Sequence, residues 1–372
     1  MTRTVLILAI ISSLTIIFSL QTVFVIGIVK TICLGLFLIF GIIPLAFRYS
    51  YTFQRNMLFL PFVRWPRNVD FNKPEKLGLL GARNFYVNTP KGISLGAWHI
   101  LPQSMVKDSE TAPKRDDFFE GALTHGQPII LYMHGNSGSR AGLHRIELYH
   151  VLQKLEYHII AFDYRSYGDS SAVAPSEEGV VDDGVFMYRW TQQRSGKAPL
   201  FVWGHSLGTG ISSHVLSRLS QQSVDGAQMA GTDPSHSADP LALVLESPFN
   251  NIRDEIREHP LAQFFSWMPW FDFFFLDPVH QNNLRFETDR HLKSVKVPII
   301  ILHAEDDAVV PYKLGRKLYH SAVQGRSAGD SPVLFAKFDA VHRYGHKYIC
   351  RSPELPSIIS KFFNDSMRPT NA

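Results

Sequence analysis

Cysteine is nearly absent from this sequence, which contains only Cys33 and Cys350 in 372 residues. Cys33 lies inside an apolar N-terminal stretch, so we do not expect the two to pair, and a fold built on disulfides is excluded. Dense runs of lysine or arginine are also missing, and the formal net charge is only +4. The sequence therefore gives little support for a nucleic-acid-binding protein. With 45% hydrophobic and 12% aromatic residues, the composition is that of a globular protein.

Charged residues are missing from Val5 to Val29, and again from Thr31 to Phe47 after the single Lys30. As a helix, the first stretch would span about 37 Å, more than the roughly 30 Å hydrocarbon core of a bilayer. A cleaved signal peptide is the alternative, but its apolar region should be only about 7–15 residues long. We therefore predict a transmembrane anchor over residues 1–50, built as one long helix or as a hairpin around Lys30.

Two features predict opposite orientations for the part of the chain that follows the anchor. Arg48, Arg55, Arg64 and Arg67 follow the apolar stretch, and the positive-inside rule then favours a cytosolic catalytic domain. The sequon Asn364-Asp365-Ser366 could be glycosylated only in the opposite orientation.

Short apolar runs, separated by segments long enough for helices, follow the anchor. Continuous runs of this kind are typical of buried parallel strands, and their alternation with helices predicts an open α/β sheet with its chemistry beyond the carboxyl ends of the strands. Residues 51–366 form the expected catalytic domain and 367–372 a tail. Two polar stretches, 103–126 and 221–240, are expected to loop out into solvent. The predicted strands are 128–133, 158–162, 199–203, 241–245, 297–302 and 333–338.

The third predicted strand leads directly into Gly204-His205-Ser206-Leu207-Gly208, a G-x-S-x-G pentapeptide. In a strand-to-helix turn this pattern exposes the serine hydroxyl, and small neighbours let strand and helix approach each other. The following helix N-terminus favours developing negative charge. The pattern alone also fits a tight turn whose hydroxyl has no function. Its place after a buried strand indicates that Ser206 is a nucleophile.

A nucleophilic serine needs a general base and an acid that orients the base, and in this fold they follow in the order Ser, Asp, His. Asp306 and Asp307 lie directly after the fifth predicted strand, and we favour Asp307 because it precedes the Val-Val-Pro that begins the next element. His342 and His346 both follow the last strand. The residues by themselves leave the choice of histidine open.

An acyl-transfer enzyme also needs an oxyanion hole made of two N–H groups. We expect one from Leu207, next to the nucleophile, and the other from Asn136 in the Gly-rich loop after the first predicted strand, with Gly135 supplying backbone freedom. A phosphate-binding loop is the rival interpretation, but the Gly-Lys-Ser/Thr ending is missing. The turn from Asp163 to Ser170 is expected to be structural.

The segment Leu261–Leu276 is dense in phenylalanine and tryptophan and is interrupted by Pro269. A core helix is one interpretation, but no clean helical period emerges. Between nucleophile and acid, such a segment is expected to belong to a lid, here 251–291, that binds an acyl chain. The expected substrate-binding residues are Phe264, Phe265, Trp267, Trp270 and Phe271.

Beyond these single sites, longer motifs resemble the α/β-hydrolase domain-containing protein 12 family of membrane lipases, over about Phe53 to Phe363. They include PIILYMHGNSGSR, FDYRSYGDS, WGHSLGTG, LESPFNNIRDEIREHP and ILHAEDDAVVP. The resemblance implies a triad of Ser206, Asp307 and His346, since the family's histidine precedes Lys-Tyr as His346 does. It also implies hydrolysis of lysophosphatidylserine and monoacylglycerols, and an endoplasmic-reticulum enzyme with a lumenal catalytic domain.

We therefore expect a membrane-bound serine hydrolase of the α/β-hydrolase fold that cleaves one acyl ester of lysophospholipids and monoacylglycerols. Its expected partners are a lipid substrate in the bilayer and the membrane itself; no metal, cofactor or nucleic acid is expected. An acyl-protein thioesterase uses the same machinery and is the first alternative. The second is a catalytically silent hydrolase fold that serves as a membrane-tethered scaffold.

Overall fold

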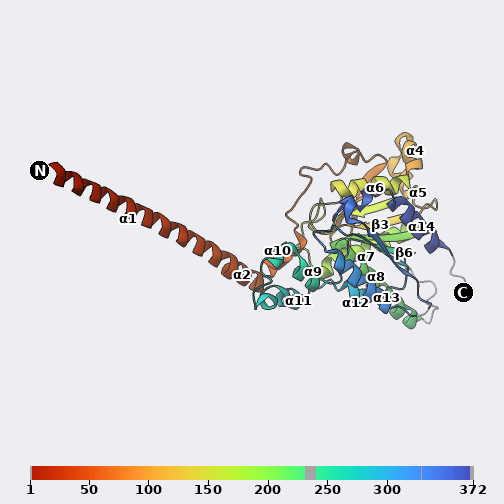
Figure 1. Ribbon diagram of the computed structural model, residues 1–372. Helices are drawn as coiled ribbons and strands as arrows, with labels where there is room; N and C mark the ends of the chain where they lie inside the picture. Colours follow the sequence, from red (N-terminus) through yellow and green to blue (C-terminus); the bar gives the residue numbers. More distant parts are fainter. Residues whose placement is uncertain (1, 231–239, 328, 369–372) are drawn as a thin grey trace.

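The computed structural model describes residues 2–230, 240–327 and 329–368 (Figure 1). Its centre is an eight-stranded sheet in the order β1-β2-β4-β3-β5-β6-β7-β8. The strands from β3 to β8 run parallel, while β1 and β2 pair antiparallel at one edge. The strands are β1 Ala82–Asn88, β2 Ser94–Ile100, β3 Ile129–Met133, β4 His158–Phe162, β5 Leu200–His205, β6 Ala242–Glu246, β7 Ile299–Ala304 and β8 Val333–Phe338.

All six predicted strands are confirmed, with ends shifted by at most two residues. They were recognisable because five of them are buried along their whole length, and a strand covered on both faces is a continuous apolar run. The antiparallel pair β1 and β2 was missed. Strand β1 is buried only at some positions, and β2 contains Gly96 and His99, so neither forms an apolar run.

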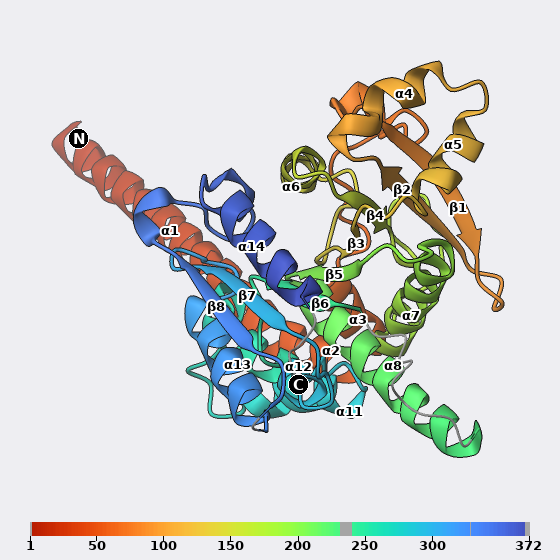
Figure 2. The same cartoon turned by 90° about the vertical axis from the view of Figure 1, so that its right-hand side faces the viewer.

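Helices cover both faces of the sheet (Figures 1 and 2). Along β3, Leu131 contributes to one core cluster and Tyr132 to the other, as the alternation of a strand requires. The first cluster includes side chains from α7 Glu177–Arg194, α8 Leu207–Ala230 and α13 Tyr312–Gln324. The second includes side chains from α6 Leu143–Lys154 and α14 Leu355–Met367.

The N-terminal region is one continuous helical rod rather than a hairpin. It consists of α1 Thr2–Phe37, a π-helical turn η1 Leu38–Ile42 and α2 Ile43–Tyr49. Lys30 lies within α1 and does not interrupt it. Val5–Tyr49 is long and apolar enough to cross a membrane, and Figure 1 shows α1 extending far from the rest of the molecule. Helix α3 Tyr51–Phe59 then leads into the globular domain.

The two polar stretches differ from expectation. Residues 103–126 do not simply loop out, since they form η3 Gln103–Met105, α4 Val106–Thr111 and α5 Arg115–Ala122. Phe119 and Ala122 of α5 pack with Leu101 in a small core, which explains why the segment folds despite its charge. At the second stretch α8 continues to Ala230, and residues 231–239 lie outside the described part of the chain.

A cap of short helices connects β6 to β7 and packs against the end of the N-terminal rod (Figure 1). Phe40 stacks on Phe264 with 5.3 Å between ring centroids, and Phe47 lies 5.3 Å from Phe275. The cap contains α9 Ile252–Glu258, α10 Pro260–Gln263, η5 Asp272–Leu276, α11 Asp277–Gln281 and α12 Thr288–His291; the remaining short helices are η2 Pro74–Leu77, η6 Ala340–His342 and η7 Ile349–Arg351.

Candidate active site

Ser206 lies at the turn between β5 and α8 in a left-handed conformation, with φ of 53°. A non-glycine residue in this region is strained, and close packing of the turn maintains it. A Cβ on Gly208 would lie 2.0 Å from the Met133 carbonyl oxygen, and one on Gly204 would lie 2.5 Å from the Gly208 carbonyl oxygen. The prediction that Ser206 needs small neighbours is therefore explained by these close backbone contacts, which leave no room for a Cβ at Gly204 or Gly208.

Ser206, His346 and Asp307 form one hydrogen-bonded series. His346 Nε2 lies 2.9 Å from Ser206 Oγ, and His346 Nδ1 lies 2.8 Å from Asp307 Oδ2. The three residues follow β5, β8 and β7, whose carboxyl ends meet at one edge of the sheet because the strands are parallel. His342 lies elsewhere, exposed and stacked on Tyr344.

Asp306 has a separate position. Its Oδ2 accepts a hydrogen bond of 3.0 Å from the backbone N–H of Gly345, directly before His346. Asp307 Oδ1 instead accepts from the N–H groups of Val309 and Val310, both at 2.9 Å. The Asp307 carboxylate thus contacts the His346 imidazole, while the Asp306 carboxylate stabilises the loop that carries His346.

Two further histidines support the triad, and the sequence pattern did not assign them a role. His205 Nε2 donates to the carbonyl oxygen of His346 at 2.9 Å, which ties the base to the nucleophile's own strand. His303 Nε2 donates to Val310 O at 3.0 Å and lies 3.4 Å from Asp307 Oδ2. Burial, together with the nearby His346, lowers the pKa of His205 well below its usual range, so this ring stays neutral.

The electrostatics of the site keep Asp307 ionised. Burial by itself would raise the pKa of Asp307, but the charge of His346 and hydrogen bonds from His303 and His346 outweigh it and hold that pKa well below its usual range. A carboxylate that stays charged can fix the imidazole tautomer and stabilise an imidazolium. The arrangement can therefore draw a proton from the Ser206 hydroxyl.

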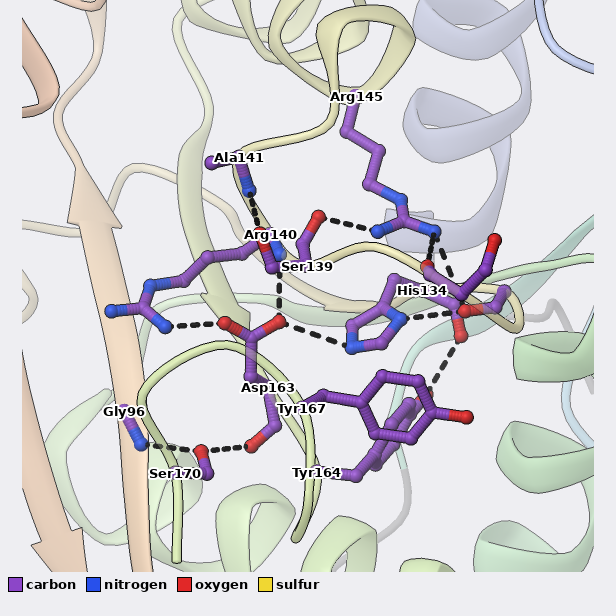
Figure 3. Close-up of polar contacts among 12 residues, drawn as sticks. Gly96, His134, Ser139, Arg140, Ala141, Arg145, Asp163, Tyr164, Tyr167 and Ser170 are labelled. Carbon is purple, nitrogen blue, oxygen red and sulfur yellow. Dashed lines mark hydrogen bonds and ion pairs between the residues drawn. The ribbon is translucent and has the colours of Figure 1, made fainter. Parts of the chain in front are cut away.

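The loop after β3, from His134 to Arg140, is held by a buried polar network (Figure 3). Asp163, at the end of β4, accepts from the Arg140 backbone N–H at 2.7 Å, forms a short ion pair with the Arg140 guanidinium and lies 3.2 Å from His134 Nε2. Burial would raise the pKa of Asp163, but Arg140 and His134 lower it below its usual range. As expected, the Asp163–Ser170 turn is structural: Ser170 Oγ donates to Asp163 O at 2.7 Å.

The same network orients the peptide group between Gly135 and Asn136. The Gly135 carbonyl oxygen lies 2.7 Å from His134 Nδ1 and 3.3 Å from Arg145 Nη2. In a planar trans peptide the following N–H points the opposite way, so these two side chains determine the direction of the Asn136 N–H. Gly135 is needed for space and not for a left-handed backbone, since its Cβ would lie 2.9 Å from Ser206 Cβ.

A cavity of about 320 Å³ opens on Ser206, Leu207 and Asn136. The structure thus places both residues predicted to supply N–H donors in the wall of the cavity that contains the nucleophile. As the first residue of α8, Leu207 has an N–H without an intrahelical acceptor. A larger hollow of about 640 Å³ around Trp65 does not include the nucleophile. The apolar walls of the nucleophile cavity come from the rod, helix α3, the cap and the loop after Asp307: Ile43, Phe47, Phe53, Met57, Leu58, Phe249, Ile256, Phe265, Phe275, Val309 and Val310.

Of the five aromatic residues expected to bind substrate, only Phe265 lines this cavity. Phe264 and Trp267 pack on Phe40 of the rod instead. Phe271 is buried against Phe275, and Trp270 is about half exposed, at 48%. The sequence pattern identified an apolar cap but could not show which rings face the nucleophile, because the segment has no regular period.

Glu177, His214 and His291 form a group outside this cavity whose potential ligand atoms lie within 4.8 Å of one another. The Glu177 carboxylate already accepts from the N–H groups of Arg285 at 2.6 Å and Phe286 at 2.9 Å. The two imidazole rings stack 4.0 Å apart and nearly parallel, so their lone pairs do not converge on one point. We interpret this group as a contact that joins α7, α8 and α12.

Comparison with known proteins agrees with this geometry. Residues 128–289 match the family model described as the alpha/beta hydrolase fold. The chain is 41% identical over 333 residues to the lysophosphatidylserine lipase ABHD12 of Danio rerio, covering 90% of this chain and 83% of the relative. It is 42% identical to that of Rattus norvegicus, covering 87% and 77%, and 33% identical to human Protein ABHD12B, covering 83% and 79%.

Solved structures share the fold at low sequence identity. The Pyrococcus furiosus esterase Pf2001 aligns with a TM-score of 0.56 at 19% identity, covering 82% of this chain and 98% of the esterase. An α/β hydrolase from Vibrio vulnificus aligns with a TM-score of 0.57 at 16% identity, covering 86% and 94%. From these relatives and this fold, the chain is a hydrolase that belongs to the α/β-hydrolase domain-containing protein 12 family.

Proposed function

We propose that this protein is a membrane-anchored serine hydrolase that releases a fatty acid from lysophosphatidylserine and from monoacylglycerols. The observation that carries the proposal is the hydrogen-bonded series Asp307–His346–Ser206 at an apolar cavity, one wall of which belongs to the N-terminal rod. The relatives named lysophosphatidylserine lipase support the choice of lipid.

In this mechanism His346 removes the proton of the Ser206 hydroxyl, and Ser206 Oγ attacks the carbonyl carbon of the acyl ester. Asp307 holds the imidazole tautomer and stabilises the imidazolium. The N–H groups of Asn136 and Leu207 stabilise the oxyanion. His346 protonates the departing alcohol oxygen and then activates a water molecule, which releases the fatty acid and restores Ser206.

Covalent labelling with a fluorophosphonate tests the nucleophile. We expect the full-length chain in detergent to be labelled and Ser206→Ala to be unlabelled. His342→Ala is the matched control, because His342 does not contact the triad, and it should be labelled like the wild type. A folded wild-type protein that resists labelling would instead favour the catalytically silent scaffold.

A substrate panel tests the lipid class. We expect turnover of lysophosphatidylserine and monoacylglycerol to exceed that of a peptide carrying a palmitoyl thioester. The reverse order would identify an acyl-protein thioesterase, since the two activities use the same triad and differ only in the leaving group.

We also propose that the N-terminal rod spans the endoplasmic-reticulum membrane with the catalytic domain in the lumen. Asn364 is exposed on α14, which supports access to its sequon. In cells, endoglycosidase treatment should then lower the mass of the wild type but not of Asn364→Gln. An unchanged wild-type mass, together with protease sensitivity of the domain in sealed microsomes, would indicate the cytosolic orientation that Arg48 and the arginines after it favour.

A further inference from the structure

Helix α9 of the cap carries five charged residues, and one of them differs from the others. Four form ion pairs outside the cavity: Arg253 and Arg257 with Asp272, at 3.1 and 2.7 Å, Glu258 with Lys313 at 2.5 Å, and Asp254 with Lys317. Glu255 instead lines the cavity that opens on Ser206. Its Oε2 atom is shielded from solvent and has no hydrogen-bond partner among the described residues.

The other polar side chains that the cap and helix α3 place around this cavity already have hydrogen-bond partners. Gln54 Nε2 donates to Phe47 O at 2.6 Å, and Gln54 Oε1 accepts from Asn282 at 2.7 Å. His259 Nδ1 accepts from the Leu261 N–H at 3.3 Å. Glu255 is therefore the carboxyl group in the cavity wall that remains available to a bound molecule.

A shielded carboxyl oxygen without a partner lowers the stability of the fold, so its presence in the cavity that opens on the nucleophile indicates a functional site. Burial, followed by the charges of Asp307 and Glu258, raises the pKa of Glu255 to about 8. Near neutral pH the group therefore carries a proton and can both donate and accept a hydrogen bond.

We propose that Glu255 is a specificity-determining residue that hydrogen-bonds the free glycerol hydroxyl beside the scissile ester. The proposal rests on the proposed lipase function and adds the feature of the substrate that the cavity recognises. In a monoacylglycerol or a lysophospholipid, the nearest free hydroxyl lies two carbons from the ester oxygen. The carbonyl oxygen and the departing oxygen of the ester already have Asn136, Leu207 and His346 as partners in the proposed mechanism, so this hydroxyl is the polar group near the ester that still needs one. A cationic head group is a poorer match, because placing an ammonium in a mainly apolar cavity costs far more than placing a hydroxyl there.

The test compares esters that share an oleoyl chain: monooleoylglycerol, methyl oleate, which has no hydroxyl, and oleoylcholine, which has a cation and no hydroxyl. The full-length protein is used in detergent micelles as wild type, Glu255→Gln, Glu255→Leu and Glu255→Ala. Glu258→Leu is the matched control, because it removes a carboxylate from the same helix but outside the cavity.

For Glu255→Leu and Glu255→Ala we expect the ratio of kcat/KM for monooleoylglycerol to kcat/KM for methyl oleate to fall about 10- to 100-fold. Glu255→Gln should stay within roughly threefold of the wild type, since an amide also donates and accepts. Glu258→Leu should leave the ratio at the wild-type value.

An unchanged ratio in both truncating variants overturns the proposal, as does an equal fall in Glu258→Leu, which would mean general damage to α9. Equal losses in Glu255→Gln and Glu255→Leu, largest with oleoylcholine, would identify a cation site and also overturn it. Fluorophosphonate labelling distinguishes a failure of the Glu255 proposal from a failure of the proposed hydrolase function. A labelled wild type with an unchanged ratio contradicts only the role of Glu255, whereas an unlabelled wild type contradicts the hydrolase function itself.

Discussion

Two buried carboxyl groups lie near Ser206 at the carboxyl ends of neighbouring strands, and their pKa values shift in opposite directions. Asp307 accepts hydrogen bonds from two N–H groups and from His346, so its charged form is stabilised. Glu246, at the end of β6, has Trp203 Nε1 as its side-chain donor, at 2.9 Å. Burial, then the charge of Asp307, raises the pKa of Glu246 to about 7, although the Trp203 hydrogen bond opposes the shift.

The contact between Asp307 and His346 predicts the effect of Asp307→Asn. The amide cannot stabilise the imidazolium and favours the wrong tautomer, so kcat should fall by roughly 10⁴-fold with the fold retained. Esterase kinetics and a melting curve check this. Asp306→Asn is the matched control, because it removes the neighbouring carboxylate that contacts Gly345; an equal loss there would show that the acid has been assigned to the wrong residue.

The raised pKa of Glu246 predicts a stability that depends on pH. Because the folded pKa lies above the unfolded value of 4.5, the stabilisation is fully present below about pH 4.5 and is lost as the pH rises through about 7. Over this window the loss amounts to about 3 kcal/mol. Glu246→Gln, which cannot ionise, should therefore gain stability relative to the wild type between pH 5 and 8.5.

Denaturant unfolding of both proteins at the two pH values measures this gain. Glu354→Gln, at an exposed position, serves as the control and should show no such trend. A Glu246→Gln variant whose advantage is the same at both pH values would mean that Glu246 does not titrate in this window.

At the scale of elements, the loop between β3 and α6 is shaped by side chains from its neighbours rather than by its own sequence. Arg145 of α6 donates to the carbonyl oxygens of Gly135, Ser137 and Ser139, and Asp163, directly after β4, forms an ion pair with Arg140. Figure 3 shows these groups converging on the loop from both sides. The loop is thus preorganised before substrate binds, which is what electrostatic stabilisation of an oxyanion requires.

This arrangement predicts that Arg145→Met lowers kcat by about 100-fold, with a smaller change in KM, because the Asn136 N–H loses its fixed direction. Arg351→Met is the control, since Arg351 also contacts α6, through Glu147, but is largely exposed. Its kinetics should match those of the wild type. If Arg145→Met changes only the melting temperature, the guanidinium has a structural role and does not orient the donor.

At the scale of the whole molecule, the N-terminal rod and the cap form one unit that covers the catalytic edge of the sheet. Arg48 donates to Phe273 O at 2.5 Å, and its guanidinium lies 3.7 Å from the centroid of the Phe273 ring. Ile43 and Phe47 of the rod line the cavity together with Phe275 of the cap. The element that we propose to span the bilayer is therefore also part of the substrate cavity.

The shared wall predicts that Phe47→Ala raises KM for a long-chain monoacylglycerol at least several-fold and affects a short-chain ester less. The reason is that the Phe47 ring lines the apolar cavity that we propose holds the acyl chain, and a longer chain buries more surface there. Phe24→Ala is the control: Phe24 is 69% exposed on α1, and its loss should change neither value. Equal effects on the long and short esters would show that Phe47 does not contact the acyl chain.

Much of the fold and of the site is determined by the sequence itself, because the signals are local. A strand buried on both faces is a continuous apolar run, a rod without charges is a long apolar helix, and a nucleophile between a strand and a helix needs glycines at fixed spacing. Ser206, Asp307 and the oxyanion loop are recognisable in this way, and the family motifs point to His346. Only the tertiary structure shows the antiparallel edge formed by β1 and β2 and the continuity of the rod past Lys30. It also shows that Phe265 is the one ring, among the five aromatic residues expected to bind substrate, that lines the cavity. The same is true of Glu255: on α9 it is one charge among five, and only the packing of the cap over Ser206 turns it inward without a partner.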